Sequence, residues 1–403
     1  MRILMINSVC GIGSTGRICT DLADLLEKQG HEVKIAYGRG NVPEKYERYA
    51  VRIGTDADVR LHGVKTRLLD RHGFGSRAAT VKFIEWVESY SPDVIHLHNV
   101  HGYYVNIEVL FKYLRRCEKK IIWTLHDCWT FTGHCSYFDY VGCEKWKTEC
   151  FACPQVKEYP KSFLIDSSKT NFADKKELFT NIPNMMLVTP SVWLKNVVGS
   201  SFLGEYPIQV IPNGIDISVF NPTESDFREK NQLTDKKIIL GVANIWDRRK
   251  GLDTFAELSK KLDEKYKIVL VGLSKKQIKA LPQNILGIER TDSVKQLCEI
   301  YTAADVFVNP TMEDNYPTVN MEAIACGTPV VTFRTGGSPE MLDPLTGVVV
   351  ERNDIDSLEN EIKRITNESV FDKNNCVQRS AEFDKNKCFG KYVELIGMVS
   401  DIK

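Results

Sequence analysis

Acidic residues flank the start of a predicted helix within residues 308–323. Asp314 and Glu313 lie in the loop after an apolar strand, and Glu322 lies inside the helix that begins near Thr318. The backbone N–H groups at such a helix start can bind a phosphate. A carboxylate inside the helix can accept hydrogen bonds from both hydroxyls of a ribose. A helix-surface acid is usually only solvated, so Glu322 gains its meaning from the residues around it.

A glycine-rich turn at residues 11–16 follows the first strand and precedes a helix. Its sequence, Gly-Ile-Gly-Ser-Thr-Gly, fits the G-x-G-x-x-G pattern of dinucleotide sites. Such sites also place an acid at the end of the second strand, but here that strand ends Ala36-Tyr37-Gly38-Arg39. An arginine could serve a 2′-phosphate, which leaves an NADP-dependent oxidoreductase as an alternative. A glycine turn also lets any other ligand approach the backbone closely.

Four cysteines crowd into an irregular, aromatic-rich stretch of the first half. Cys135, Cys143, Cys150 and Cys153 form the pattern C-x7-C-x6-C-x2-C. A Cys-x-x-Cys pair lets two thiolates share one tetrahedral ion, and two further cysteines can complete a structural zinc site. Cys128 or His134 could replace one of the four ligands. The alternative is a loop that holds free thiols.

The overall composition is that of a globular enzyme. Of the 403 residues, 53 are Lys or Arg and 53 are Asp or Glu, and this balance does not suggest a nucleic-acid binder. The first residues read as a β-strand, without the apolar core of a signal peptide, and no apolar run approaches the length of a membrane span. We therefore expect a cytoplasmic protein. The basic stretch at residues 60–82, which contains Arg67 and Arg71, is either a solvated face or a patch for phosphates or an anionic membrane.

Apolar runs alternate with helical periodicity along both halves of the chain. Such alternation predicts parallel sheets covered by helices on both faces. Strands are expected at residues 2–7, 31–37, 94–97, 121–125 and 186–189, and then at 208–211, 237–242, 267–271, 306–309, 329–333 and 347–350. The predicted fold class is α/β, with two doubly wound Rossmann-like domains facing each other across a cleft.

The predicted domain limits follow from the two series of strands. The N-terminal domain spans residues 1–205 and includes the cysteine- and aromatic-rich loop at 128–170. The C-terminal domain spans residues 206–384. An amphipathic helix at 385–403 is expected to pack back onto the first domain.

The segment around Asp314 resembles the donor site of retaining family 4 glycosyltransferases, which have the GT-B fold. Further segments are similar to that family in the same order along the chain, so the resemblance covers most of it. They are His96-Leu97-His98, Thr124-Leu125-His126-Asp127, the entry to the second domain at 210–216, the basic loop at Lys250-Gly251-Leu252 and the glycine turn at 335–340. An enzyme of this family binds a nucleotide sugar with its C-terminal domain and the acceptor with its N-terminal domain.

The resemblance assigns roles to particular residues. His126 is placed beside the reacting sugar, and Asp314 or the neighbouring Glu313 holds the sugar hydroxyls, since Asp314 fits the spacing E-x7-E to Glu322. Asn244 stands where the family has an arginine, so Arg248 or Arg249 must supply that charge beside Lys250. The remaining donor-binding residues implied by the resemblance are Gly13, Asn315, Tyr316, Pro317, Thr318, Val319 and Glu322.

The resemblance implies a glycosyltransferase, and the residues of its site suit the charges that develop in the transfer reaction. Cleavage of a sugar–phosphate bond builds negative charge on the leaving diphosphate, which Lys250 and backbone amides near Gly13 and Thr318 would stabilise. No catalytic metal is required. The expected partners are a UDP or GDP sugar and a saccharide or lipid-linked acceptor in surface polysaccharide synthesis, at the inner face of the membrane. The alternatives are a nucleotide-sugar epimerase, the NADP-dependent oxidoreductase and a non-catalytic sugar-nucleotide-binding protein.

Overall fold

The computed structural model describes residues 1–398 and divides the chain into two compact units. Unit 1 contains Met1–Ile211 together with the chain from Phe389 onward, and unit 2 contains Pro212–Cys388. These limits lie four to six residues beyond the boundaries predicted at 205/206 and 384/385. The predicted closing helix is α14 (Lys385–Met398), and residues 399–403 of that prediction lie outside the described residues.

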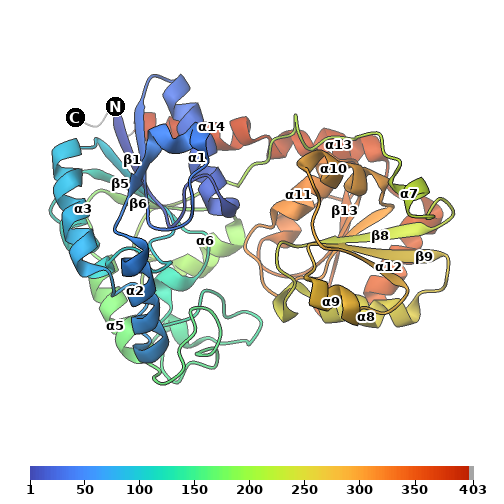
Figure 1. Cartoon of the computed structure of the whole chain (residues 1–403), viewed down its shortest axis with the longest axis horizontal. Helices are drawn as coiled ribbons and strands as arrows, with labels where there is room; N and C mark the ends of the chain where they lie inside the picture. Colours follow the sequence, from blue (N-terminus) through green and yellow to red (C-terminus); the bar gives the residue numbers. More distant parts are fainter. Residues whose placement is uncertain (399–403) are drawn as a thin grey trace. The chain divides into compact units, whose positions relative to one another are not determined.

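A parallel sheet of seven strands forms the centre of unit 1. Its strand order is β3-β2-β1-β4-β5-β6-β7. All strands are parallel, and the order in which the chain adds strands switches from one side of β1 to the other, where β4 pairs with it. The strands are β1 (Arg2–Ile6), β2 (Glu32–Tyr37), β3 (Ala50–Arg52), β4 (Val94–Leu97), β5 (Lys120–Thr124), β6 (Met185–Thr189) and β7 (Ile208–Val210). The main helices are α1 (Gly13–Lys28), α2 (Asp56–Leu69), α3 (Arg77–Tyr90), α4 (Ile107–Leu114), α5 (Ser168–Phe179) and α6 (Val192–Gly199) (Figure 1).

Unit 2 has a second parallel sheet, of six strands. Its order, β10-β9-β8-β11-β12-β13, reverses between β8 and β11. The strands are β8 (Lys237–Val242), β9 (Tyr266–Val271), β10 (Ile285–Ile288), β11 (Val306–Asn309), β12 (Val330–Phe333) and β13 (Gly347–Val350). The helices are α7 (Phe227–Lys230), α8 (Leu252–Lys261), α9 (Lys275–Ala280), α10 (Val294–Ala303), α11 (Thr318–Ala325), α12 (Ile355–Glu368) and α13 (Lys373–Ser380).

The strand predictions need three corrections. The edge strands β3 and β10 were missed, because neither carries a long apolar run. Residues 208–211 were assigned to the second domain, but β7 pairs with β6 in the first sheet, with Leu187 opposite Ile208. Ile208 also packs against the hydrophobic core of unit 1, so the change of domain comes after this strand.

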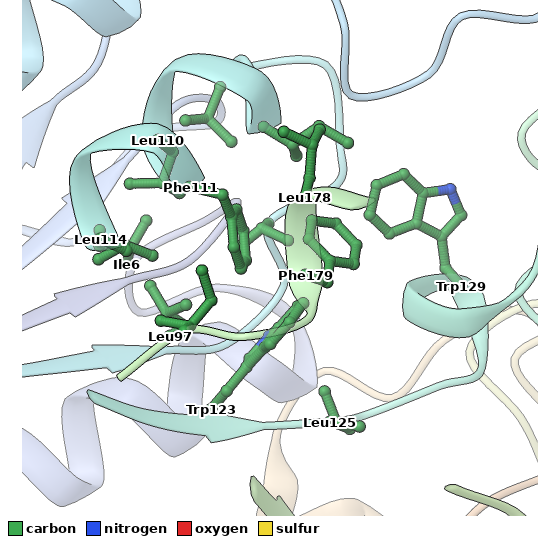
Figure 2. Packing of buried hydrophobic residues seen from close by; sticks show 14 of the residues in the cluster. Ile6, Leu97, Leu110, Phe111, Leu114, Trp123, Leu125, Trp129, Leu178 and Phe179 are labelled. Atoms are coloured by element: carbon green, nitrogen blue, oxygen red, sulfur yellow. The ribbon is translucent and has the colours of Figure 1, made fainter. Parts of the chain in front are cut away.

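The core of unit 1 lies between β4, β5 and the helices α4 and α5. Trp123, Phe111 and Phe179 are fully buried, with ring centroids of neighbouring pairs 4.3–5.1 Å apart (Figure 2). Buried aromatic side chains of this size contribute heavily to stability. This core fixes β4 and β5, and the histidines described below directly follow these two strands.

The segment at 128–170 has little regular structure. It contains two short 3-10 turns, η2 (Trp129–Phe131) and η3 (Lys145–Lys147), before α5 begins. Phe131, Phe138 and Trp146 are buried and pack against one another, with centroid distances of 4.7–6.2 Å. These aromatic residues therefore form a local core.

None of the helices within residues 1–398 is both long and apolar enough to cross a lipid bilayer.

Candidate functional site

The predicted donor residues of unit 2 follow two strands that lie side by side. Lys250 comes after β8 and Asp314 comes after β11, and these two strands pair in parallel. They are also the strands at which the sheet order reverses. In open α/β sheets, ligands bind beyond the carboxyl ends of the strands at such a reversal.

An ion pair joins the two predicted groups. The Lys250 ammonium donates to the carboxylate of Asp314, and both side chains are mostly buried. Glu313, the alternative acid, is buried, and its backbone carbonyl accepts from the Arg249 guanidinium at 3.1 Å. Asp314 is therefore the acid that lies beside the lysine.

The basic loop is held by a short 3-10 turn. This turn, η4, spans Arg248–Lys250, and the Asp247 carboxylate accepts from the Lys250 backbone N–H at 3.0 Å. Gly251 ends it with a φ of +76°, and a Cβ there would lie 2.3 Å from the Pro310 carbonyl oxygen. A residue without a Cβ is thus needed for the basic loop to approach the loop after β11.

The loop at residues 335–340 packs against the loop that contains Asp314. The Gly337 backbone N–H donates to the Asn315 carbonyl at 2.9 Å, and the Thr335 hydroxyl donates to the Thr311 carbonyl at 2.9 Å. Gly336 adopts a φ of +52° where a Cβ would lie 1.6 Å from the Asp314 carbonyl oxygen. The glycine turn predicted at 335–340 is therefore part of the scaffold of the acidic loop.

Helix α11 begins without a side-chain cap and is anchored by a buried polar network. Its N-cap is Pro317, which provides no side-chain acceptor for the first N–H groups of the helix, among them Thr318 and Val319. Within the helix, the Asn320 amide joins Asn309 of β11 at 2.8 Å and Ser338 at 3.0 Å. These contacts fix the helix start against the sheet.

Glu322 lies one turn after Thr318. Its carboxylate accepts from the buried Tyr301 hydroxyl at 3.0 Å, and its side chain is half-buried. A phenol that donates to a carboxylate fixes its orientation. This geometry suits a carboxylate that binds ligand hydroxyls.

The other predicted donor residues are distributed around this centre. Asn315, Tyr316 and Pro317 are buried in the loop that leads into α11. Asn244 and Arg248 are exposed, whereas Arg249 is half-buried and contacts the acidic loop. Arg249 is thus the arginine that the structure places against the segment containing Asp314.

In unit 1, the glycine turn follows β1 at the reversal of the first sheet. Gly13 is the first residue of α1, is exposed and has no atom within 4 Å of the position of a Cβ. The Gly11 backbone N–H donates to the Gly16 carbonyl at 3.1 Å. The turn is therefore compact and leaves backbone accessible beside Gly13.

His126 follows β5, is half-buried and contacts two buried histidines in a row, His98 and then His96. Its Nε2 lies 3.0 Å from Nδ1 of His98, which follows β4, and His96 packs against His98 with ring centroids 4.1 Å apart. Burial lowers the pKa of His126 to about 4. The imidazole is therefore neutral near pH 7 and can orient a ligand without adding charge.

A second pair beside His126 was not predicted. The Asp127 carboxylate lies 2.9 Å from Nε2 of His101, and His101 Nδ1 lies 3.2 Å from the Tyr159 hydroxyl. Burial raises the pKa of Asp127, but His101, the Trp129 backbone N–H and His126 together lower it more, so the net shift is downward. The sequence could have indicated this pair by position alone, because His101 follows β4, Asp127 follows β5, and these two strands pair with each other.

The four predicted metal-ligating cysteines come together around one cavity. Cys135, Cys143, Cys150 and Cys153 all contribute to its wall. A hydrogen bond from Cys135 lowers the pKa of the Cys153 thiol. Among residues 1–398, no group of three or more His, Cys, Asp or Glu side chains is arranged to hold a metal ion.

Comparison with known proteins agrees with the two-unit architecture. Residues 15–158 match the model of "Glycosyltransferase Family 4", and residues 236–368 match that of "Glycosyl transferases group 1". A putative colanic acid biosynthesis glycosyl transferase, WcaC of Escherichia coli K12, is 26% identical over 378 residues, with 88% of each chain covered.

Solved structures share the fold over the whole chain. Sucrose-phosphate synthase from Thermosynechococcus elongatus has a TM-score of 0.74 at 18% identity, with 100% of both chains covered. HepE of Anabaena, solved with UDP-glucose, has a TM-score of 0.68 at 15% identity, with 99% of this chain and all of the other covered. The two family models together match more than half of the chain, which therefore belongs to the group 1 and family 4 glycosyltransferases and is a glycosyltransferase of the GT-B fold.

Proposed function

We propose that this enzyme transfers a sugar from a nucleoside-diphosphate donor to a saccharide or lipid-linked acceptor, with retention of anomeric configuration, in surface polysaccharide synthesis. The observation that carries the proposal is the Lys250–Asp314 ion pair at the strand reversal of unit 2, together with the uncapped start of α11. Lys250 and the helix N–H groups suit a diphosphate, and Asp314 and Glu322 suit hydroxyls. Family membership favours a transferase over the epimerase, oxidoreductase and non-catalytic alternatives.

The roles divide among the groups of the site. Lys250 and Arg249 would offset the charge that develops on the leaving diphosphate, Asp314 would hold the sugar, and Glu322 would hold the ribose. His126 in unit 1 would orient the donor sugar as a neutral imidazole. A UDP sugar is the first donor to test, because HepE was solved with UDP-glucose and WcaC is named for colanic acid biosynthesis.

We predict that a Glu322→Gln variant binds the donor more weakly. Calorimetric titration of the whole chain with UDP-glucose, UDP-galactose and GDP-mannose should identify a donor, and the variant should lose about 10- to 100-fold in affinity for it. The loss corresponds to about 1.5–3 kcal/mol for a hydrogen bond to a charged group. Glu257→Gln, on the exposed face of α8, is the matched control and should bind like the wild type.

The transfer itself is tested with the donor that binds most tightly. Release of nucleoside diphosphate should require a lipid-linked saccharide acceptor, and NMR of the product should show the anomeric configuration of the donor. Binding of none of the sugar nucleotides would contradict the donor assignment. An inverted product would contradict retention alone.

We further propose that a surface of unit 1 contacts an anionic membrane that carries the acceptor. Leu61 on α2 and Phe163 and Leu164 in the 128–170 segment are 69%, 63% and 74% exposed. The Phe163 backbone N–H donates to the Arg67 carbonyl at 2.8 Å, which places the two segments side by side. Exposed apolar residues next to the exposed Arg60 and Arg67 suit the surface of anionic lipids.

The basic stretch is not uniformly available for this contact. Arg71, which was grouped with Arg67, forms an ion pair with Asp174 at 2.7 Å and stacks over Phe74 at 3.7 Å. Lys65 donates to the Phe74 carbonyl at 2.8 Å, and Arg77 pairs with Glu108 at 2.9 Å. These residues stabilise unit 1, so the membrane proposal rests on Arg60 and Arg67.

We predict that a Leu61→Asp/Leu164→Asp variant binds vesicles of phosphatidylglycerol and phosphatidylcholine at least about tenfold more weakly. Each exposed leucine that enters the lipid interface contributes on the order of 1–2 kcal/mol, which the aspartate removes. Vesicle sedimentation measures the change. Leu345→Asp, at an exposed leucine of unit 2, is the control, and equal binding of both variants would contradict this surface.

A further inference from the structure

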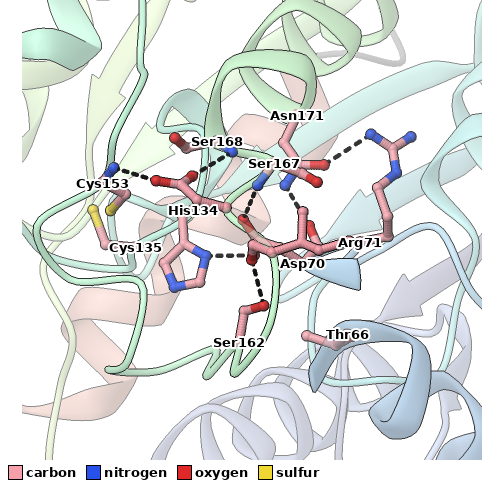
Figure 3. A network of polar contacts seen from close by, with 12 residues as sticks. Thr66, Asp70, Arg71, His134, Cys135, Cys153, Ser162, Ser167, Ser168 and Asn171 are labelled. Atoms are coloured by element: carbon pink, nitrogen blue, oxygen red, sulfur yellow. Dashed lines mark hydrogen bonds and ion pairs between the residues drawn. The ribbon is translucent and has the colours of Figure 1, made fainter. Parts of the chain in front are cut away.

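One small cavity in unit 1 gathers an unusual set of sulfur and nitrogen atoms. It lies within the irregular segment at 128–170, and its wall includes Cys135, Cys143, Cys150, Cys153 and His134. Aromatic side chains complete the wall, among them Phe138 and Trp146. Figure 3 shows the sulfur atoms of Cys135 and Cys153 next to each other, although 18 residues separate them in the sequence. A protein core without a ligand would not need four thiols around one space.

Backbone groups donate to two of these sulfur atoms. The Gln155 N–H donates to Cys153, two residues earlier, and the Gly133 N–H donates to Cys150. A thiolate accepts such bonds far better than a thiol does, because it carries a full charge. The N–H of the second residue after a cysteine is placed to stabilise that cysteine as a thiolate.

A buried histidine, His134, also lines this cavity. His134 Nδ1 lies 2.5 Å from the Asp70 carboxylate, and both side chains are at most 1% exposed. Asp70 is itself fixed by the Ser167 backbone N–H at 2.8 Å (Figure 3). The other nitrogen of His134, Nε2, is buried and has no hydrogen-bond partner. A buried nitrogen of this kind indicates that something polar belongs in the cavity.

A buried lysine supplies positive charge beside the cysteines. Lys175 of α5 is 1% exposed, and its ammonium donates to the carbonyls of Trp129 at 2.7 Å and Thr132 at 2.9 Å. These acceptors are neutral, so they do not balance the charge. Burial lowers the pKa of Lys175 to about 7, whereas Cys150 and Cys135, followed by Asp70 and Asp127, favour its charged form. An anionic cluster of thiolates would compensate the buried ammonium.

We propose that Cys135, Cys143, Cys150 and Cys153 bind one zinc ion as four thiolates and that this ion holds the 128–170 segment in place. Four sulfur ligands with a Cys-x-x-Cys pair suit tetrahedral zinc in a closed structural site. Zinc with four thiolates carries a net charge of minus two, which Lys175 partly neutralises. His134 Nε2, if protonated, can donate to a ligand sulfur from outside the ligand set. The site does not depend on the proposed transferase chemistry.

The arrangement also explains why this segment can be so irregular. It has only two short 3-10 turns in its first part, and its local aromatic core is small. A metal ion fixes such a segment with few residues, since the energy of metal binding becomes folding energy. The four side chains are not arranged to hold an ion in this structure, so binding zinc would require them to move toward one another.

The test begins with the metal content of the whole chain. Protein purified under reducing conditions without an affinity tag should contain one zinc per chain, measured by inductively coupled plasma mass spectrometry. Exchange with Co²⁺ should give the absorption of a tetrahedral thiolate site. Cys143→Ser and Cys150→Ser should each lower the zinc content at least tenfold after dialysis against a weak chelator. Cys117→Ser removes a half-buried thiol elsewhere in unit 1 and should keep the metal.

Two results would overturn the proposal. One is a wild-type chain that contains less than one tenth of an equivalent of zinc and takes up none when it is titrated in its folded state against a chromophoric chelator. This experiment needs no variant, so a failure of the serine variants to fold cannot obscure it. The other is loss of the metal in His134→Gln with full retention in Cys143→Ser, which would contradict the assigned ligands.

Discussion

Replacing Lys250 with methionine is expected to lower kcat/KM for sugar transfer by about 10²- to 10³-fold, or about 3–4 kcal/mol of transition-state stabilisation. Lys250 lies in η4 at the strand reversal and its ammonium pairs with Asp314, where the leaving diphosphate would gain negative charge. Methionine keeps the length and apolar stem of lysine and removes only the charge and its donors. Steady-state rates with saturating acceptor measure the change. Lys260→Met, at an exposed lysine of α8, should stay within about twofold of the wild type.

The ion pair with Asp314 complicates a single substitution. Removing Lys250 leaves the half-buried Asp314 carboxylate without its partner, which alone could disturb the site. A Lys250→Met/Asp314→Asn double variant separates the two effects, because it removes both charges at once. If Lys250 acts on the diphosphate, the double variant remains as inactive as Lys250→Met. Recovery to near wild-type activity would show that the lysine only neutralises Asp314.

The donor side was predictable because its residues are contiguous in the sequence. The strand β11, the acidic loop and α11 follow one another within residues 306–325, so local pattern was enough to place Asp314 and Glu322 near a helix start. The pairing of Asp314 with Lys250 required more. It depends on β8 and β11 being neighbours although 63 residues lie between the end of β8 and the start of β11, and only the sheet order supplies that fact.

The parts that sequence could not supply are set by contacts between distant segments. The basic stretch at 60–82 looked uniform, yet Arg71 is tied to Asp174 of α5, more than 100 residues later. His101 and Asp127 are unremarkable residues until β4 and β5 bring them within 2.9 Å. The strand at 208–210 has the same local pattern in either domain, and its pairing with β6 decides between them. In each case tertiary contacts overrode or completed a local signal.

Acidification from pH 6.5 toward pH 4 is expected to unfold unit 1 while leaving unit 2 folded. All eight histidines of the chain lie within residues 31–134, and none lies in unit 2. Burial lowers the pKa of His62 and His96 to about 3 and that of His126 to about 4. Burial also places the pKa values of His72 and His98 well below the ordinary value.

The sign of the effect follows from proton binding. In the unfolded chain these histidines bind protons below about pH 6.5, whereas in the folded unit His62, His96 and His126 remain neutral down to about pH 3–4 and His72 and His98 stay neutral well below their ordinary pKa. Their contribution to stability is therefore fully present above pH 6.5 and is lost as the pH falls. Each group costs about 1.4 kcal/mol per pH unit once its unfolded form is protonated, so five groups approach about 7 kcal/mol per unit. His134 acts in the opposite direction, because Asp70 raises its pKa, but it is a single group.

Tryptophan fluorescence measures this unfolding selectively. Five of the six tryptophans lie in unit 1, and Trp246 alone lies in unit 2. Urea unfolding monitored by fluorescence at pH 7.5, 6.5, 5.5 and 4.5 should give a free energy that falls steeply between the last three, since a domain's total stability is only about 5–15 kcal/mol. Deuterium uptake of unit 2 peptides is the internal control and should change far less. A free energy of unfolding of unit 1 that is equal at pH 7.5 and 4.5 would mean that these histidines take up protons in the folded state, and the neutral imidazole assigned to His126 would then be wrong as well.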